Sequence, residues 1–364
     1  MKILIINPGS TSTKISLYED ERLIFEESPF HDAPELLKYK TVNEQLPFRK
    51  KVILDMLKRN GTDPSEIDVY VGRGGSAYTQ PSGVTVIDER LFEDTKNNVG
   101  GSGHPAKLGV MLAYELCREY GGQMFTLNPT NVDELCDYAR LTGIDGIYRK
   151  AQSHVLNQKA VASYHARRMG KTYEQCRFIV SHIDGGITVS AHRYGAMIDG
   201  NVGAGGDGAY TPTRIGSVPV GNVLDYLENH SVDELKSMLS SSGGFESYFG
   251  TYKSDEIHKM MDDGNRKAEL VWNGMIYQIC KQIGAMSAVL EGRVDAILLT
   301  GGLTRFDDLV ESVKRRCEWI APVSVYVGEM EQETMLLETL RVLRGEIKAN
   351  HYSGKPVWNG FDFD

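Results

Sequence analysis

Residues 1–20 read MKILIINPGSTSTKISLYED, and residues 177–196 read RFIVSHIDGGITVSAHRYGA. In each stretch an apolar run enters a polar, glycine-containing turn, and apolar residues then alternate with polar ones. This pattern predicts two strands joined by a tight turn. The turns begin at Asn7 and His182, 175 residues apart, which is close to half the chain. A repeat of that length indicates a duplicated domain rather than a solenoid, whose repeats are much shorter.

Strands and amphipathic helices alternate along the rest of the chain. We expect helices over 46–59, 106–120, 131–141, 155–169, 265–291, 307–318 and 331–344, and further strands over 67–71, 296–299 and 323–327. Thr304 and Asp307 have capping-box spacing, which predicts a helix start there. This order predicts an α/β fold with mostly parallel sheets covered by helices. We expect a first domain over 1–150, rejoined by 331–364, and a second over 151–330.

The composition limits the class of protein. The 364 residues carry a net charge of −9 and no basic block, which argues against nucleic acid as a partner. Five cysteines without metal-ligand spacing indicate a reduced chain. No apolar run approaches the roughly 20 residues of a membrane span, so we expect no membrane partner. Met1 runs directly into the first strand without a signal-peptide pattern, so we expect a cytoplasmic protein.

Three turns have the composition of anion sites, namely 7–14, 182–186 and 301–302. They offer hydroxyls, backbone N–H groups and glycines that allow close approach. Each alone is equally compatible with a plain turn, but together they favour a nucleotide clamped between two similar domains. The sequence has no GxxxxGK[ST], and the GxGxxG at 203–208 precedes Thr-Pro rather than a helix, so we reject a dinucleotide fold.

Several segments carry a specific resemblance. They are NPGSTSTK at 7–14, GRGG at 72–75, RKAQSHVLNQKAVA at 149–162, FIVSHIDGGITVSAHRYG at 178–195, TPTRIGSVP at 211–219 and ILLTGGLTRFDDLVESVKRR at 297–316. Together they resemble the butyrate kinase family, in the acetate kinase branch of the sugar kinase, heat-shock chaperone and actin superfamily. The resemblance implies two similar actin-like (ribonuclease H-like) domains with a nucleotide cleft between them. It also implies reversible phosphoryl transfer between ATP and a short-chain carboxylate, giving ADP and an acyl phosphate, with Mg²⁺.

The resemblance also implies roles for individual residues. It assigns ATP and phosphate binding to Asn7, Ser10, Ser12, Lys14, Asp184, Gly185, Gly186, Gly301 and Gly302. It assigns catalysis to Arg73, Arg214, His154, His182 and Asn128, and metal binding to Asn7, Glu331 and Asp184. Three alternatives stay open at this point. Lys14 can be an exposed strand lysine. His154 can be a helix N-cap or a satisfied hydrogen-bond partner at the start of its helix. Glu331 or Glu329 can be an exposed acid at a helix N-terminus.

The sequence departs from the family in three places. By the resemblance, Asn128 replaces an aspartate of the family's catalytic set. This chain reads His182-Ile-Asp184-Gly-Gly where the family has His-Met-Gly-Gly-Gly, so we hypothesise that Asp184 restores the lost carboxylate. The expected acyl pocket has Ser76, Ala77, His104 and Lys107. Smaller side chains at 76 and 77 and an added cation at Lys107 predict an acid that is branched, longer or more polar than butyrate.

The expected partners are therefore a nucleotide and a small carboxylate, in a homo-oligomer (dimer or larger) by resemblance. Two alternatives remain. One is a kinase for another acid, such as isobutyrate, propionate, acetate or a substituted acid. The other is a nucleotide-binding homologue without transfer activity, which the Asn128 departure keeps open.

Overall fold

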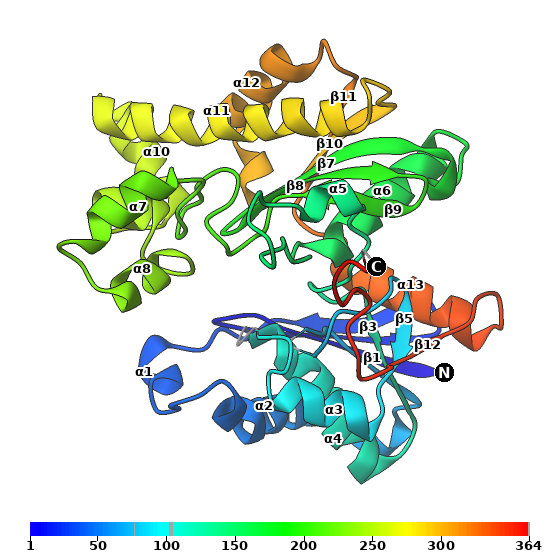
Figure 1. The fold of residues 1–364 in the computed structure, drawn as a ribbon. Coiled ribbons are helices and arrows are strands. Elements are labelled where there is room, and N and C mark those ends of the chain that lie inside the picture. The colour runs from blue at the N-terminus through cyan, green and yellow to red at the C-terminus, as the bar shows by residue number, and fades with distance from the viewer. Residues whose placement is uncertain (76, 102–104, 363–364) are drawn as a thin grey trace. The chain divides into compact units, whose positions relative to one another are not determined.

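A computed structural model describes residues 1–75, 77–101 and 105–362 of the chain. Two compact units are present (Figure 1). Unit 1 comprises residues 1–133 and 331–364, and unit 2 comprises residues 134–330.

Unit 1 is built on a seven-stranded sheet with the order β12-β5-β6-β4-β1-β2-β3. The strands are β1 (Lys2–Pro8), β2 (Thr13–Glu19), β3 (Arg22–Glu27), β4 (Val69–Gly72), β5 (Val84–Val86), β6 (Gln123–Leu127) and β12 (Asn350–His351). The helices are α1 (Ala33–Leu36), α2 (Leu46–Arg59), α3 (Glu89–Lys96), α4 (Leu108–Tyr120) and α13 (Glu331–Leu343), with 3₁₀ turns η1 (Asn43–Gln45), η2 (Pro64–Glu66) and η3 (Pro105–Lys107). Figure 1 shows α2, α3 and α4 on one face of this sheet and α13 on the other.

Unit 2 is built on a five-stranded sheet with the order β11-β10-β7-β8-β9. The strands are β7 (Arg177–Ile183), β8 (Ile187–Arg193), β9 (Ala196–Gly200), β10 (Ala296–Gly301) and β11 (Val323–Val327). The helices are α5 (Asp137–Arg140), α6 (Val155–Arg168), α7 (Val220–Leu227), α8 (Val232–Met238), α9 (Gly244–Phe249), α10 (Ser254–Asp262), α11 (Arg266–Val289) and α12 (Asp307–Cys317), with 3₁₀ turns η4 (Tyr173–Gln175) and η5 (Gly302–Arg305).

The two sheets share one topology. In unit 1 the run β3-β2-β1-β4-β6 has two antiparallel pairings followed by two parallel ones, and in unit 2 the run β9-β8-β7-β10-β11 has the same directions. The expected hairpins form in matching places, with Asn7 opposite Lys14 in unit 1 and His182 opposite Thr188 in unit 2. The predicted duplication and the α/β, actin-like fold are thus confirmed.

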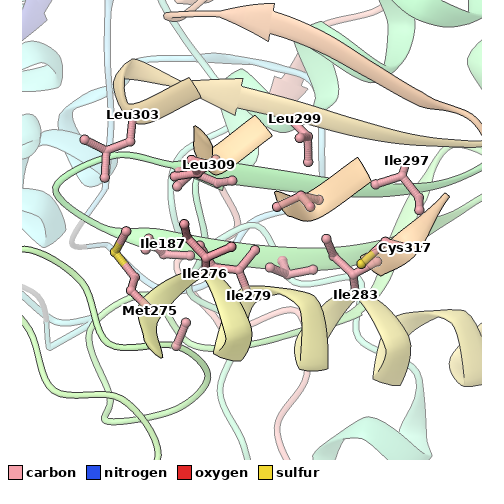
Figure 2. Packing of buried hydrophobic residues seen from close by; sticks show 14 of the residues in the cluster. Ile187, Met275, Ile276, Ile279, Ile283, Ile297, Leu299, Leu303, Leu309 and Cys317 are labelled. Carbon is pink, nitrogen blue, oxygen red and sulfur yellow. The ribbon is translucent and has the colours of Figure 1, made fainter. Parts of the chain in front are cut away.

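Alternation along β7 gives its two faces different neighbours. Ile179 and Ile183 belong to a large apolar cluster with α11 and α12, part of which Figure 2 shows. Phe178 and Val180 face the other way and pack in a second cluster with α6. Because successive side chains alternate across a strand, His182 lies on the α6 face, in line with Phe178 and Val180. The α6 face is thus apolar at Phe178 and Val180 and carries the polar His182 near the end of the strand.

Helix ends follow the local chemistry of the sequence. Asn265 caps α11 by accepting a hydrogen bond from the Ala268 N–H at 3.1 Å. Gly121, with φ of 91°, ends α4, and that positive φ strongly favours glycine. The strong periodic helices predicted over 155–169, 265–291 and 331–344 are confirmed within a few residues as α6, α11 and α13.

The prediction of a helix over 131–141 is wrong, since the structure has only the short α5 there. Asn131 instead donates from its side-chain amide to the carbonyls of Ala77 and Tyr78, and the Asp133 N–H donates to the Gln80 carbonyl. These long-range hydrogen bonds hold the segment extended and override its helical periodicity.

The capping box predicted at Thr304 is also wrong. The Thr304 hydroxyl donates to the Gly301 carbonyl at 2.7 Å within η5, and Phe306 occupies the N-cap position of α12 without a side-chain cap. Among the helices that the structure describes, none combines the length and apolar composition needed to span a membrane.

Candidate active site

In unit 1, three predicted site residues come together from separate elements. Asn7 lies in β1, Arg73 directly follows β4, and Glu331 begins α13. The Asn7 Nδ2 donates to Glu331 Oε2 at 2.8 Å, and Arg73 Nη1 donates to Asn7 Oδ1 at 3.3 Å. Arg73 Nη2 lies 3.0 Å from Glu331 Oε1. The Glu331 carboxylate is 2% exposed, so the alternative of an exposed acid at a helix start does not apply to it.

The Glu331 carboxylate keeps one oxygen without a hydrogen bond. Oε1 forms the ion pair with Arg73 but has no hydrogen-bond partner among the described residues. A buried carboxylate oxygen of this kind is a suitable ligand for a hard cation such as Mg²⁺. The amide oxygen of Asn7, which faces the same arginine, is a second oxygen of that type.

The glycines around Arg73 allow a close approach of strand and helix. A Cβ on Gly72 would lie 2.0 Å from the Gly109 carbonyl oxygen in α4, and a Cβ on Gly109 would lie 2.3 Å from the Arg73 carbonyl oxygen. These contacts with rigid backbone exclude any larger residue at both positions. The Arg73 backbone N–H also donates to the Ile6 carbonyl at 2.9 Å. The arginine is thereby fixed beside the end of β1.

A buried arginine that we did not predict supports the first turn. Arg49 of α2 donates from Nη1 to the Ser12 carbonyl at 2.6 Å and from Nη2 to the Ser10 carbonyl at 3.2 Å. Burial lowers the pKa of the Arg49 guanidinium to about 10. Lys14 forms a 2.8 Å ion pair with Glu26 on the neighbouring strand β3. Arg49 thus holds the backbone of the turn through its carbonyls, and the ammonium of Lys14, which we predicted to bind phosphate, is paired with a carboxylate.

Asn128 has a structural task, which an asparagine or an aspartate can perform. Its φ is 40°, in the left-handed region that asparagine tolerates better than most residues. Its Oδ1 accepts hydrogen bonds from the Gly83 N–H at 2.7 Å and from the Ser82 hydroxyl at 2.9 Å. The amide that replaces the family aspartate therefore ties down the loop at 82–83.

The expected acyl-pocket residues are only partly described. Ser76 and His104 lie outside the described residues. Ala77 is fully buried. Lys107 is 1% exposed and donates to Asn98 Oδ1 at 2.6 Å and to the Lys96 carbonyl at 3.3 Å. Burial lowers the pKa of the Lys107 ammonium, and its recorded hydrogen bonds go to neutral groups.

In unit 2, the two predicted histidines stack. The rings of His154 and His182 lie 4.0 Å apart between centroids, at an interplanar angle of 14°. His154 occupies the N-cap position of α6 without a side-chain capping bond, so the N-cap alternative does not account for its imidazole. Its Nδ1 instead lies 2.9 Å from the Thr188 hydroxyl.

Arg214 completes this group through Gly186. A Cβ on Gly186 would lie 2.6 Å from Arg214 Nη1 and 2.9 Å from His154 Cε1, so both side chains border this glycine. Arg214 Nη1 donates to the Gly203 carbonyl at 2.5 Å, while its Nε has no hydrogen-bond partner among the described residues. Burial lowers the pKa of the Arg214 guanidinium. Thr211 joins the same loop to the second turn by donating to the Gly185 carbonyl at 2.8 Å.

Asp184 links the second and third turns. Its carboxylate accepts hydrogen bonds from the Gly185 N–H at 2.8 Å and from the Gly302 N–H at 2.7 Å. Gly301 has φ of 98°, and a Cβ there would lie 2.4 Å from the Ile183 carbonyl oxygen, so its identity is required by the fold. Two of the N–H groups predicted to bind phosphate are thus occupied by the carboxylate of Asp184.

One group of side chains has the spacing of a cation site. Ligand atoms of His182, Asp184 and Glu329 all lie within 4.8 Å of one another. His182 Nε2 and Glu329 Oε1 are 3.9 Å apart. The structure thus groups Asp184 with Glu329. From the sequence, Glu329 is considered only together with Glu331, as an acid at a helix N-terminus.

Sequence reasoning missed the residues that support the site. They are Arg49, Asn157, Thr188 and Thr300. Only Asn157 left a signal, because it follows His154 by three positions in the expected helix and therefore shares its face.

Residues 141–327 match the acetokinase family, a span of slightly more than half the chain. The chain belongs to the acetokinase family. It is therefore a carboxylate kinase by family, and the family uses ATP and ADP. The predicted resemblance to the acetate kinase branch is confirmed at this level.

Solved structures agree with the fold. An acetate kinase from Porphyromonas gingivalis is 19% identical, with a TM-score of 0.74 over 94% of this chain and 99% of that one. An acetate kinase from Entamoeba histolytica is 16% identical, with a TM-score of 0.73 over 94% and 99%. A propionate kinase from Francisella tularensis subsp. tularensis is also 16% identical, with a TM-score of 0.73 over 93% and 98%.

Proposed function

We propose that this protein is a carboxylate kinase of the butyrate kinase type. It transfers the γ-phosphoryl group of ATP reversibly to a short-chain carboxylate, giving ADP and an acyl phosphate. The observation that carries the proposal is the Arg214 group in unit 2. The partly buried Arg214 guanidinium and the His154 imidazole border Gly186, and the His182 ring stacks on His154. The structure shows no ion pair between Arg214 and a carboxylate among the described residues. Such a cluster suits the oxygens of a transferring phosphoryl group.

The chemistry needs no general base. A carboxylate is already ionised near neutral pH, so one of its oxygens attacks the γ-phosphorus directly while the bond to the β,γ-bridging oxygen breaks. The electron pair of that bond leaves with ADP. Arg214 holds phosphoryl oxygens through its planar fork, and His182 donates a hydrogen bond to the same group. Arg73 orients the acyl carboxylate, a task for which a second arginine fork is suited.

A divalent cation fits the oxygen-rich groups of each unit. Glu331 and Asn7 offer oxygens in unit 1, and Asp184 and Glu329 offer carboxylates in unit 2. When bound, Mg²⁺ neutralises charge on the nucleotide phosphates. The chain's own carboxylates would hold it, and the reaction steps above remain those of the arginines and the histidine.

The preferred acid is proposed to be butyrate or a branched relative. The fully buried Ala77 leaves more room than a large apolar side chain would. Isobutyrate, propionate, acetate and substituted acids are the competing substrates, because pocket changes of this size shift specificity by only about 1–3 kcal/mol.

A panel assay tests the proposal. Acyl phosphate is trapped as the hydroxamate after incubation with ATP, Mg²⁺ and each straight or branched acid of two to six carbons. We expect product, with the highest kcat/KM for a four- or five-carbon acid, and none from the Arg214→Ala protein run in parallel. Product with acetate alone would overturn the butyrate assignment.

One observation favours a second candidate, a nucleotide-binding homologue without transfer activity. Asn128 is committed to the loop at 82–83 and replaces the family aspartate. That candidate predicts ATP binding in calorimetry together with no hydroxamate from any acid in the panel.

The compensation hypothesis has its own test. If Asp184 replaces the charge lost at Asn128, Asp184→Ala should lower kcat about tenfold or more and raise the Mg²⁺ concentration that gives half-maximal rate. Asp184→Asn is the matched control, because it can still accept hydrogen bonds from backbone N–H groups but carries no charge. We then expect Asn128→Asp to recover part of the rate in the Asp184→Ala protein. Full activity of Asp184→Ala alone would show that no compensation occurs.

A further inference from the structure

The buried side chain of Asn157 has a fixed orientation. It lies in α6, fully buried, and its Oδ1 is 2.9 Å from the backbone nitrogen of Met330. A backbone N–H can only donate, so the atom that faces it must be the amide oxygen. The amide nitrogen is then the atom that faces the sheet. This assignment rests on the hydrogen-bond partners themselves and leaves no freedom to exchange the two ends of the amide.

The amide nitrogen of Asn157 faces the imidazole of His182. Nδ2 lies 2.9 Å from His182 Nδ1 and 3.1 Å from the Thr300 hydroxyl oxygen. His182 and Thr300 are opposite residues on β7 and β10, so one side chain reaches both. Thr300 in turn donates its hydroxyl proton to the Gly328 carbonyl at 2.8 Å, which leaves its oxygen free to accept from Asn157. In this series of buried hydrogen bonds, the donors of Asn157 and Thr300 therefore each meet an acceptor.

An amide nitrogen has protons to give and no lone pair with which to accept. The Nδ1 atom of His182 must then be unprotonated, and the proton of the neutral ring lies on Nε2. We infer that Asn157 is a positioning residue that fixes His182 as the neutral Nε2–H tautomer. The inference rests on the proposed function for its catalytic meaning, since it makes Nε2–H a permanent donor for phosphoryl oxygens.

The neighbouring histidines differ in whether, and by which residue, their tautomers are set. His154 Nδ1 meets the Thr188 hydroxyl, which can donate or accept, so its tautomer is not set by that contact. His192 is set, but by another residue. Gln158 gives its Nε2 proton to the Thr188 carbonyl at 3.2 Å, so its oxygen accepts from His192 Nε2 at 3.0 Å.

The fixed tautomer also bears on the group formed by His182, Asp184 and Glu329. A protonated Nε2 has no lone pair, so it cannot bind a cation while Asn157 keeps its orientation. The groups that face this ring are the His154 imidazole, the Asp184 carboxylate and the Glu329 carboxylate, whose Oε1 is 3.9 Å away. A cation in this part of unit 2 would be held by the carboxylates, and the histidine would serve as donor.

Nitrogen-15 NMR of the full chain labelled in histidine tests the tautomer directly. We expect His182, identified by the signals lost in His182→Gln, to show a protonated Nε2 and an unprotonated Nδ1. In Asn157→Asp the side chain offers an oxygen to Nδ1. The proton of His182 should then move to Nδ1, so that the two nitrogen shifts exchange, or both ring nitrogens should become protonated. Asn273→Asp, on the exposed face of α11, adds the same charge and removes a hydrogen bond to the Glu269 carbonyl within the helix, so it should leave the His182 signals unchanged. A protonated Nδ1 in the wild-type protein would overturn the inference.

A double-mutant cycle tests the catalytic meaning. Asn157→Asp should lower kcat about 10–100-fold with a KM for ATP changed less than about threefold. In a His182→Ala background the same substitution should change kcat less than about twofold, because Asn157 acts through the imidazole. An equal loss in both backgrounds would contradict the inference and leave Asn157 with a structural role. The NMR measurement does not require turnover. A protein that is inactive with every acid would therefore overturn the proposed function, and the NMR measurement would still show whether the tautomer of His182 is fixed.

Discussion

The two arginines predicted to perform catalysis have opposite surroundings. Arg73 in unit 1 lies 3.0 Å from the carboxylate of Glu331 and donates to Asn7 at 3.3 Å. Arg214 in unit 2 donates to the carbonyl of Gly203, its Nε has no hydrogen-bond partner among the described residues, and burial lowers its pKa. A cation that faces only neutral dipoles gains more from an arriving anion than one already paired with a carboxylate.

This difference separates two tasks. In the proposed function, Arg214 is an anion site, and a bound anion relieves the cost of burying its charge. Arg73 forms an ion pair with the buried Glu331 carboxylate and so helps to hold α13 against the sheet of unit 1, in addition to its proposed role in binding. The four predictions that follow test this contrast, from the largest expected effect to the smallest.

Removing Arg214 should abolish most of the activity without destabilising the protein. We expect Arg214→Ala to lower kcat/KM about 1,000-fold or more, as loss of an arginine does in other phosphoryl transfers. The thermal midpoint should stay unchanged or rise, because a partly desolvated charge is lost. Arg214→Lys should recover little, since its ammonium lacks the planar fork. A loss below about tenfold in the hydroxamate assay would remove Arg214 from the mechanism.

Removing Arg73 should affect activity and stability together. We expect Arg73→Ala to lower kcat/KM about 100–1,000-fold and the free energy of unfolding by about 3 kcal/mol, because the buried Glu331 carboxylate loses its counter-ion. The double variant Arg73→Ala, Glu331→Gln should regain most of the stability and none of the activity. Urea unfolding measures the first effect. An Arg73→Ala protein as stable as the wild type would show that the contrast with Arg214 does not hold.

The substitution Gly186→Ala should displace the Arg214 guanidinium without unfolding the protein. The added Cβ would lie 2.6 Å from Arg214 Nη1, the flexible end of that side chain. We expect kcat to fall about 10–100-fold from misplacement of about 1 Å, with a thermal midpoint within a few degrees of wild type. Gly221→Ala is the matched control, because a Cβ there meets nothing within 4 Å. Equal activities of the two variants would argue that the position of Arg214 is not critical.

Within the part of the chain that the structure describes, Lys107 donates to neutral groups, so it should behave as a buried cation that lacks a carboxylate partner. Burial lowers its pKa in the folded state below the value in the unfolded chain, so the folded state binds fewer protons at alkaline pH. The cost of burying the charge is then full at neutral pH and is relieved as pH rises through the lowered pKa. We expect Lys107→Met to raise the thermal midpoint slightly at pH 7 and to lose that advantage near pH 10. A lower midpoint at pH 7 would mean that the bonds to Asn98 and Lys96 outweigh the burial cost.

Local patterns predicted the elements that local chemistry decides. The alternation and glycine turns at 7–14 and 182–186 predicted both hairpins, and the 3.6-residue periodicity predicted α6, α11 and α13. The segment over 131–141 failed because hydrogen bonds from Asn131 and Asp133 to residues more than fifty positions away hold it extended. Such partners are not visible in a local window.

The site divides in the same way. Glycine-flanked Arg73 and the turn residue Asp184 could be selected from the sequence, since their neighbours along the chain mark them. The bond of Asp184 to the Gly302 N–H, and the support of the first turn by Arg49, depend on contacts between distant segments. Their geometry becomes apparent only when the sheets are assembled.

The route of the chain through unit 1 has a consequence for biosynthesis. Glu331 opens α13, and β12 pairs with β5 at the sheet edge, so the ribosome adds both pieces only after the whole of unit 2. Unit 2 is complete in sequence when Met330 emerges, whereas unit 1 still lacks a helix, a strand and the counter-ion of Arg73. At about 5–20 residues per second, the closing segment arrives within seconds. During that interval Arg73 lacks the carboxylate with which it pairs in the folded protein. The face of the unit 1 sheet that α13 later covers is then exposed to chaperones at the ribosome.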